Sequence, residues 1–507
     1  MSSTVAMSLD RGRQYPDRPP FHPSEAYPEY AHGDISPEVN EAYAAVRDVL
    51  AYLGLDRERF GTPEWNPLGD FIDPGSRVAI KPNLVISEHP LGDRGMEASV
   101  AHGSILRAVI DYALIALGGE GSIVIGDSPI KEVDFDRVTR TCGLRDVVDW
   151  YQSQKFEVEL RDFRDLIAYR NDLGVILRTE PVQNAVGSVT VDLGTASALE
   201  GTPLDLVRST AAVYDDFARQ VHGPGRHLYA VSKAVIEADA VISVCKLKTH
   251  IKTGVTASIK NFVGSTNKKE WLPHFRRGTP KRGGDRFADE APAKRRVQES
   301  VKEFVWSNRY LRGKTLHNVT KRAWTMGVGR ALDRTVAENA AGYDYGNGDW
   351  FGNDTAWRMA TDTCMAALFG RPDGTLAETQ ARPCLHIVDS IMAGDRNGPL
   401  KPEPKHVGLI AGALDPVALD TTCVYVMGYK PDTVPHIAGI HAAGRPLGTS
   451  DESEIEVVLN GEAREPASLL DLGIRFVPPD AWAARLNGSP TPEPAGRGEG
   501  VLYSEEG

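Results

Sequence analysis

The chain has 507 residues, which is enough for roughly two to four domains of ordinary size or for one large α/β core with insertions. Its hydrophobic fraction of 41% and charged fraction of 25% are those of a globular protein, and they exclude a disordered, collagen-like or disulfide-dense chain. The sequence contains no run of about 18 apolar residues and no apolar signal stretch near its start. We therefore expect a cytoplasmic protein without a membrane span.

Charge is unevenly distributed along the chain. The whole chain carries −12, but residues 246–334 hold 22 Lys and Arg against 7 Asp and Glu, a net charge of +15. The remainder holds 35 against 62, a net charge of −27. Such a basic block predicts a partner that is an anion, a nucleic acid or an acidic protein. The alternative is a solvated basic face packed against an acidic neighbour.

The first half of the chain alternates helix and strand patterns. Residues 1–33 contain five prolines without periodicity and predict an extended N-terminal arm. Helical spacing over 36–53 follows, with Ser-Pro as the start signal and a glycine as the stop signal. Apolar strands are expected at 77–81 and 122–126, separated by a helix at 104–117.

The same pattern returns later in the chain. We expect a helix over 230–238 before a strand at 240–244, further strands at 385–388 and 407–411, and a helix over 417–427. Short, wholly apolar strands are typical of a sheet that helices cover on both faces. The sequence therefore predicts an α/β fold with a mainly parallel sheet.

The pattern also predicts how the chain is divided. The α/β core is expected in 34–264 and 382–480, with a smaller α+β subdomain or flap at 151–228. Residues 265–381 are polar, basic and helical in pieces, which indicates a largely helical insertion or lid. The tail, 481–507, is rich in Pro, Gly and Glu and is expected to be mobile.

The segment 244–264, VCKLKTHIKTGVTASIKNFVG, has the densest chemistry. If the strand continues past residue 244, its period of two places Lys246, Lys248, His250 and Lys252 on one face. Like charges on one face repel unless an anion lies among them, so we expect a bound phosphate or carboxylate. A helix would begin after this strand and add backbone amides to the anion site. The alternative is a strand end whose lysines extend into water.

Polar residues also follow three other predicted strands, where an open α/β sheet builds its site. Lys81 and Asn83 follow the first strand, Asp127 the second, and Asp389 the strand near 387. With Asn83 or Asn397, the two aspartates offer oxygen ligands for Mg²⁺ or Mn²⁺, or act as general bases. The alternative is that these residues are helix caps and Asx-turns.

Common cofactor motifs are absent. Gly118, Gly119 and Gly121 precede a strand instead of following one, so they form no dinucleotide-binding fingerprint. No Walker sequence and no G-x-S-x-G occurs. The five cysteines form no C-x-x-C pair, which favours reduced thiols and excludes a self-contained iron–sulfur module. They are Cys142, Cys245, Cys364, Cys384 and Cys423.

The motifs together resemble those of the DUF362 family, a domain of unknown function found in bacteria and archaea. In order they cover most of residues 77–440 and read IKPNL (80–84), IGDSP (125–129), ADAVI (238–242), KLKTH (246–250), TGVT (253–256), KNFVG (260–264), IVD (387–389), NGP (397–399) and DPVALD (415–420). Asp395 and Arg396 stand where family members often have Glu-Gly. Many relatives carry a ferredoxin-like pair of iron–sulfur clusters, which the cysteines exclude here. The resemblance implies a core and a pocket without naming a reaction.

The sequence thus favours an enzyme that acts on a small anionic metabolite by proton transfer or metal-assisted group transfer. The residues expected to be catalytic are Lys248, His250 and Lys260, those expected to bind substrate are Lys81, Asn83, Lys246, Lys252, Asn261, Arg396 and Asn397, and those expected to hold Mg²⁺ or Mn²⁺ are Asp127 and Asp389. One alternative is a protein that binds nucleic acid or an acidic partner through 246–334. Another is an accessory protein for metal or iron–sulfur delivery.

Overall fold

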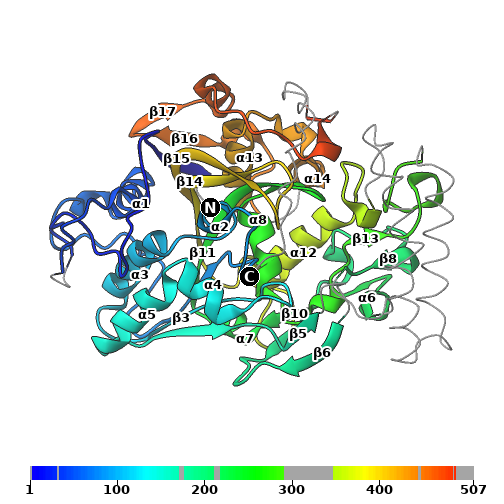
Figure 1. Ribbon diagram of the computed structural model, residues 1–507, viewed down its shortest axis with the longest axis horizontal. Coiled ribbons are helices and arrows are strands. Elements are labelled where there is room, and N and C mark those ends of the chain that lie inside the picture. Colours follow the sequence, from blue (N-terminus) through cyan, green and yellow to red (C-terminus); the bar gives the residue numbers. More distant parts are fainter. Residues whose placement is uncertain are drawn as a thin grey trace, which may run out of the picture.

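A ten-stranded mixed sheet organises the computed structural model, which describes residues 3–30, 34–170, 176–210, 217–289, 346–443, 447–483 and 485–486 (Figure 1). Across the sheet the strands are β17 (Glu462–Arg464), β16 (Glu456–Leu459), β1 (Thr4–Leu9), β15 (Glu403–Ala413), β14 (Cys384–Asp395), β11 (Ala240–His250), β2 (Arg77–Pro82), β3 (Ser122–Asp127) and β4 (Val158–Asp162), with β12 (Gly254–Thr256) paired to β11. Strands β14, β11, β2, β3 and β4 run parallel. Strand β15 is antiparallel to both β14 and β1. The α/β prediction with a mainly parallel sheet is confirmed.

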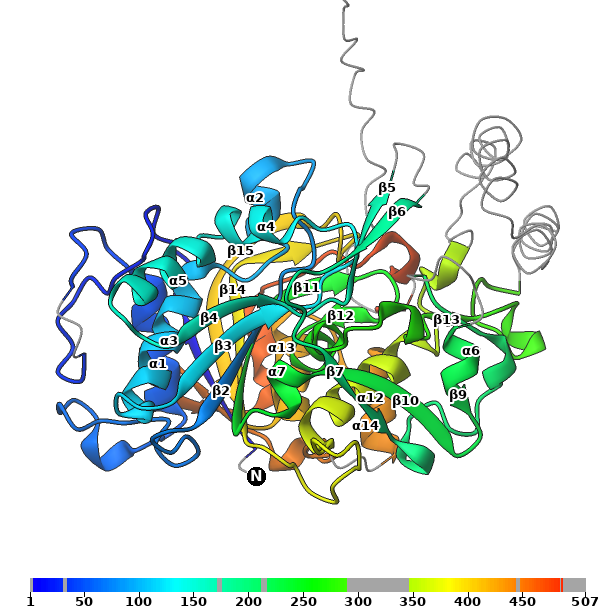
Figure 2. The same ribbon diagram turned by 90° about the horizontal axis from the view of Figure 1, so that it is seen from below.

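Helices cover both faces of this sheet, because its central strands are apolar on both sides (Figure 2). On β11, Ile242 and Val244 join one core cluster, whereas Val241 and Cys245 belong to clusters on the opposite face. The first face carries α1 (Glu41–Tyr52), α3 (Gly103–Leu117), α4 (Phe135–Thr141) and α5 (Leu144–Ser153). The second carries α7 (Lys233–Ile236), α8 (Ser258–Asn261), α12 (Ala356–Phe369), α13 (Pro416–Val426) and α14 (Pro435–Ala443). The described helices include none that is long and apolar enough to cross a membrane.

Among the described residues, three smaller sheets accompany the large one. Strand β10 (Arg226–Ser232) pairs with β7 (Ser188–Asp192) and β9 (His222–Gly223). Strands β5 (Leu166–Arg170) and β6 (Ile176–Pro181) form a separate pair, as do β8 (Val207–Arg208) and β13 (Phe275–Arg276). Short helices beside these sheets or beside the cavity described below include α6 (Phe217–Val221), η4 (Phe262–Ser265), η5 (Lys269–Trp271) and η8 (Gly346–Gly348), whereas α2 (Gly92–Glu97) packs against β15.

Three segments differ from the sequence-based expectation. Within the expected arm, β1 lies inside the large sheet, where it pairs with β15 and β16. The expected helix over 230–238 is instead the end of β10 followed by the short helix α7, because β7 supplies a pairing partner. Helix α1 starts at Glu41, after Asn40, whose side chain accepts a hydrogen bond from the Tyr43 amide.

The expected insertion is only partly described. Its residues 290–345 lie outside the described residues, as does the part of the tail beyond 486. Helix α12 falls within the insertion but is buried in the core, because most of its residues are apolar or small and hydrogen bonds from Ser197 and Tyr229 satisfy its buried Asp362. Residues 265–289 and 346–369 therefore pack against the body and help to enclose the cavity described next.

Candidate functional site

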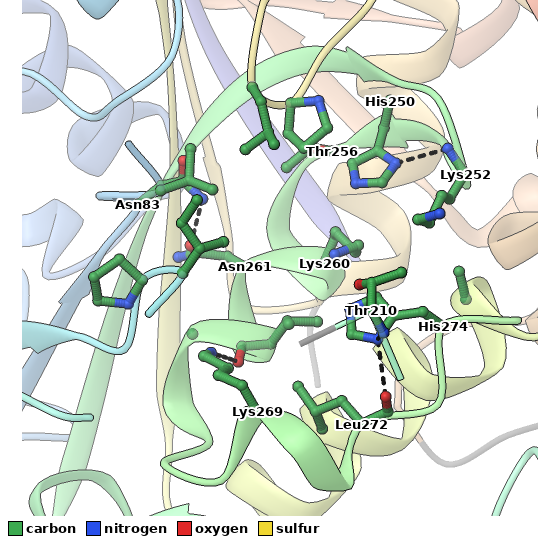
Figure 3. Close-up of a pocket in the computed structure, with 18 of the residues that line it drawn as sticks. Asn83, Thr210, His250, Lys252, Thr256, Lys260, Asn261, Lys269, Leu272 and His274 are labelled. Carbon is green, nitrogen blue, oxygen red and sulfur yellow. Dashed lines mark hydrogen bonds between the residues drawn. The ribbon is translucent and has the colours of Figure 1, made fainter. Parts of the chain in front are cut away.

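A cavity of about 380 Å³ lies where β2, β3 and β11 end, beside α8 and η4 (Figure 3). Eight of the predicted site residues line it: Lys81, Asn83, Asp127, Lys248, His250, Lys252, Lys260 and Asn261. The structure adds Lys269 and His274, which the sequence-based reasoning did not single out. They approach from the segment that follows η4, and no local pattern in the sequence marks them.

Lys246 lies outside this cavity, in a buried network with Asp389. The Lys246 ammonium donates hydrogen bonds to Asp389 Oδ2 at 2.7 Å, to the Tyr15 hydroxyl at 2.8 Å and to the Met392 carbonyl at 3.2 Å. Asp389 also accepts hydrogen bonds from Tyr15 and from the His102 amide. Burial lowers the pKa of Lys246, which the neighbouring carboxylate partly offsets. All of these groups already have partners, so the pair is arranged as a structural ion pair.

Arg396 and Asn397 also have partners of their own. Arg396 Nε lies 3.1 Å from a Glu403 carboxylate oxygen, and Asn397 Nδ2 donates a hydrogen bond to Asp480. Neither lines the cavity. Their loop reaches it two residues later, through Pro399 and Leu400.

The asparagines hold the lysines in position. Asn261 Oδ1 accepts hydrogen bonds from Lys81 Nζ at 2.9 Å and from Asn83 Nδ2 at 3.2 Å. The Asn83 side-chain oxygen accepts one from Lys248 Nζ at 2.8 Å. Lys81 further bonds the Pro82 carbonyl and lies 2.9 Å from Asp127 Oδ1. The two asparagines are thus hydrogen-bonded to each other, and Asn261 orients Lys81 while Asn83 orients Lys248.

The lysines of the cavity divide into neutralised and unneutralised groups. Lys81 forms an ion pair with Asp127, and Lys252 forms one with Asp349. Lys248, by contrast, donates only to the Asn83 side chain and the Ser99 carbonyl among the residues that the structure describes.

Lys269 and Lys260 complete the unneutralised group. Lys269 donates to the Val263 carbonyl at 2.7 Å. Lys260 has no hydrogen-bond or ion-pair partner in the part of the chain that the structure describes.

Burial and the repulsion between neighbouring ammonium groups lower the pKa values of these lysines. Burial, with the charges of Lys246 and Lys260, holds the pKa of Lys248 well below its ordinary value. Burial also lowers the pKa of Lys260 to about 8, with contributions from Lys252 and Lys81. The pKa of Lys269 falls to about 7, again mainly through burial. A buried ammonium group without a carboxylate is costly, and a lowered pKa is the expected result.

Two histidines line the cavity, and they differ in which ring nitrogen carries the proton. His250 Nδ1 accepts hydrogen bonds from the Lys252 and Thr253 amides, so the proton of the neutral ring is on Nε2. His274 Nδ1 lies 2.8 Å from the Leu272 carbonyl, which can only accept, and the Thr210 amide lies farther from the same nitrogen, at 3.4 Å. The shorter contact places the ring proton on Nδ1 and leaves a lone pair on Nε2. Burial holds the pKa of His250 well below its ordinary value and lowers that of His274 to about 3. The cavity thus contains one neutral N–H donor and one neutral base.

The amides at the start of α8 do not face the cavity as an anion site. Asp420 accepts hydrogen bonds from the Ser258 amide at 2.6 Å and from the Ile259 amide at 3.1 Å. The expectation that these amides would contact the anion is therefore wrong, because a buried carboxylate already occupies them.

The two predicted metal ligands lie on different strands. Asp127 ends β3 and Asp389 lies on β14, with β2 and β11 between them, so roughly 14 Å separates the two strands. Each carboxylate has a lysine partner. Among the described residues, no three His, Cys, Asp or Glu side chains are grouped so that they could hold a metal ion. Asp127 is the predicted metal ligand that lines the cavity.

Comparison with known proteins gives two findings. A family model described as a domain of unknown function (DUF362) matches residues 78–186 and 163–425, which together span more than half of the chain. A thylakoid-associated protein of Synechocystis sp. is 39% identical over 62 residues. That match covers 12% of this chain and 19% of the relative, so the chain spans about a fifth of the relative's length.

Proposed function

We propose, from the premise that this chain belongs to the DUF362 family, that it is an enzyme acting on a small carboxylated or phosphorylated metabolite by proton transfer. The observation that carries the proposal is the set of three unneutralised lysines around one cavity. They are Lys248, Lys260 and Lys269.

The charges around the cavity favour an anionic ligand. Six lysines line it, counting Lys131, which pairs with Glu270. The carboxylates that line it are Asp127, Glu132 and Asp349. Because the excess is cationic and buried, an anion would supply the partner that the lysines lack. Ligand cavities of this size and enclosure hold small molecules.

The histidines supply the proton chemistry in this proposal. The unprotonated Nε2 of His274 would accept a proton from the bound metabolite, and the Nε2–H of His250 would donate a hydrogen bond to the developing negative charge. Isomerisation and elimination are the reaction classes that need this pair. Metal-assisted group transfer at Asp127, with Mg²⁺ or Mn²⁺, is the variant that the sequence predicts, and a binding titration with each metal tests it.

Anion binding is the direct test. Isothermal titration with inorganic phosphate, citrate and malonate should give saturable binding to the wild-type protein. Lys248→Met and Lys269→Met should weaken binding at least about tenfold, or about 1.4 kcal/mol. Lys430→Met, at an exposed lysine outside the cavity, is the matched control and should bind as the wild type does. Absence of saturable binding for all three anions would contradict the proposal.

The two alternative functions remain predictions with their own tests. Docking of nucleic acid or an acidic protein through 246–334 predicts that neutralising Arg295 and Arg296 reduces polyanion binding, whereas Lys248→Ala does not; both arginines lie outside the described residues. Arg276 offers little free charge, because Asp285 and Asp354 neutralise it. A role in metal or iron–sulfur delivery predicts bound metal in protein purified from its host. Cell fractionation tests the proposed cytoplasmic location.

A further inference from the structure

We propose that Lys260 is a nucleophile that condenses with the substrate, so that the substrate class is an aldehyde or ketone bearing a carboxylate or phosphate. This inference rests on the proposed function, because the anionic group would be held by the same cavity. It adds a covalent step and a chemical class of substrate.

The position of Lys260 is the first argument. It extends from the four-residue helix α8, whose first turn is fixed by the hydrogen bonds from Ser258 and Ile259 to Asp420. In the view of Figure 3 its side chain lies between His250 and His274. Its charge lowers the pKa of both histidines, after burial as the main cause, so it acts on both rings. The amine thus enters the cavity from a backbone segment that two hydrogen bonds tie to Asp420.

The missing partners of Lys260 are the second argument. Lys81 has three acceptors, Lys248 has two and Lys269 has one. Lys260 has none among the residues described, although it lines the same cavity. An amine that is held by no acceptor keeps its lone pair accessible once it is deprotonated, which is what attack on a carbonyl carbon requires.

The electrostatic surroundings make the neutral amine available. With a pKa of about 8, roughly a tenth of Lys260 is neutral at pH 7, against about one part in 2,500 for an ordinary lysine. Burial is the largest cause of this lowered pKa, and the charges of Lys252 and Lys81 add to it. Buried cationic surroundings are a known way to activate a lysine for imine formation.

The remaining groups fit the step. The amine nitrogen attacks the carbonyl carbon, and its proton passes to the carbonyl oxygen to give a carbinolamine. The Lys248 or Lys269 ammonium protonates the hydroxyl, which leaves as water and gives the protonated imine, so a C=N double bond replaces the C=O double bond without any redox change. His274 Nε2 then accepts a proton from the carbon next to the protonated imine, and the electron pair of that C–H bond moves toward the C=N bond to give an enamine. The anionic group stays with the ammonium groups and the His250 N–H.

Reductive trapping tests the inference on the full chain. The protein is incubated with sodium cyanoborohydride together with one carbonyl compound in each reaction. The four compounds are pyruvate, 2-oxoglutarate, glyoxylate and glyceraldehyde 3-phosphate. Intact mass and peptide mapping should find one reduced adduct, on Lys260, with at least one probe. Its rate should rise as the pH is raised through about 8, because the neutral amine reacts. Lys260→Arg keeps the charge and should abolish the adduct, whereas Lys430→Met should leave it unchanged.

Non-reactive anions separate this inference from the proposed function. Lactate and malonate carry the carboxylate but no carbonyl that forms an imine, so their binding reports only the anion site. Anion binding without a Lys260 adduct from any probe would overturn the inference and leave the proposed function standing. Adducts spread evenly over surface lysines would also overturn it. Should Lys260→Arg fail to fold, slower trapping of the wild-type Lys260 by pyruvate in the presence of lactate would support it in its place.

Discussion

Two lysines on one strand show how the partner decides the role of a buried charge. Lys246 and Lys248 are two residues apart on β11 and are both fully buried. Lys246 meets a carboxylate, whereas Lys248 meets only carbonyl oxygens. The pairing of β11 with β14 shifts between them, from Asp389 opposite Lys246 to Gly394 opposite Lys248. Periodicity predicted one shared face, but it could not show that this irregularity places the second lysine beyond Asp389.

The buried pair of Lys246 and Asp389 leads to a prediction about stability. Asp389→Asn would leave the ammonium without its counter-charge and should cost roughly 3–5 kcal/mol of unfolding free energy. Tyr15→Phe removes one hydroxyl from the same network and should cost about 1–3 kcal/mol. Urea unfolding measures both. Glu462→Gln breaks the exposed pair with Arg464 and should change stability by less than about 1 kcal/mol. An Asp389→Asn variant as stable as that control would contradict the structural role of the pair.

Proton uptake should accompany anion binding. The pKa of Lys269 is about 7 and that of Lys260 about 8, so both are partly neutral at pH 8. A bound anion favours the ammonium forms and raises both pKa values. Affinity for inorganic phosphate should therefore fall as the pH rises from 6.5 to 9. Titration calorimetry in buffers of different ionisation enthalpy should detect protons taken up at pH 8, and release of protons would contradict the prediction.

At the scale of elements, the short turn η4 closes the site because its glycine has no side chain. A Cβ on Gly264 would overlap Asp127 Oδ1 and lie 2.5 Å from Lys81 Nζ. The Gly264 carbonyl also accepts a hydrogen bond from the Ser128 amide at 2.8 Å, so η4 is tied to the end of β3. The residue type at 264 thus determines whether α8 and η4 can approach the ion pair between Lys81 and Asp127.

A pair of glycine substitutions tests this close approach. Gly264→Ala should lower the unfolding free energy by about 1–3 kcal/mol through overpacking, and it should weaken anion binding because Lys81 must move. Gly223→Ala is the control, since nothing lies within 4 Å of its added Cβ, and it should stay within about 0.5 kcal/mol of the wild type. Thermal unfolding and phosphate titration measure both effects. Equal behaviour of the two variants would count against the packing argument.

The sequence predicted those elements whose signal is local. Strands β2, β3 and β11 are continuous apolar runs, and α3 and α13 show helical spacing, so all five were expected close to their observed places. The place of β1 within the large sheet and the burial of α12 depend on contacts with segments far away in the sequence. No local sequence pattern predicts such contacts. For the same reason Lys248 and His250 were expected in the site, whereas Lys269 and His274 were not.

At the scale of the whole molecule, the first lysines of the basic block, residues 246–334, lie inside the protein. Lys246 and Lys248 have no exposed surface, and Lys252 and Lys269 are 8% and 6% exposed. Part of the excess positive charge between 246 and 289 is therefore directed into the cavity instead of toward a macromolecular surface. An acidic body around a cationic interior makes the net charge of −12 compatible with binding a small anion.

Buried histidines should make the whole protein sensitive to acid. Burial lowers the pKa of His386 to about 3 and that of His222 to about 4, while in the unfolded chain both titrate near 6.5. At a pH between the folded and unfolded pKa values, these histidines are protonated in the unfolded state but not in the folded state. The free energy of unfolding therefore falls as the pH drops below about 6.5. Each histidine contributes up to about 1.4 kcal/mol per pH unit. Urea unfolding at pH 7 and 5 should show the loss, and His386→Asn should reduce it.

The position of β1 has a consequence for how the chain reaches its native state. Strand β1 joins β15 to β16, and Thr4 Oγ1 donates a hydrogen bond to Glu456, 452 positions away. At ribosomal elongation rates of about 5–20 residues per second, roughly 20–90 s pass between the synthesis of β1 and that of β16. Until synthesis has passed residue 413 the apolar segment 4–9 lacks both pairing partners, and until it has passed residue 456 it still lacks β16. Closure of the sheet is therefore a late, long-range event, and β1 remains an unpaired apolar edge on the nascent chain until these distant segments have been synthesised.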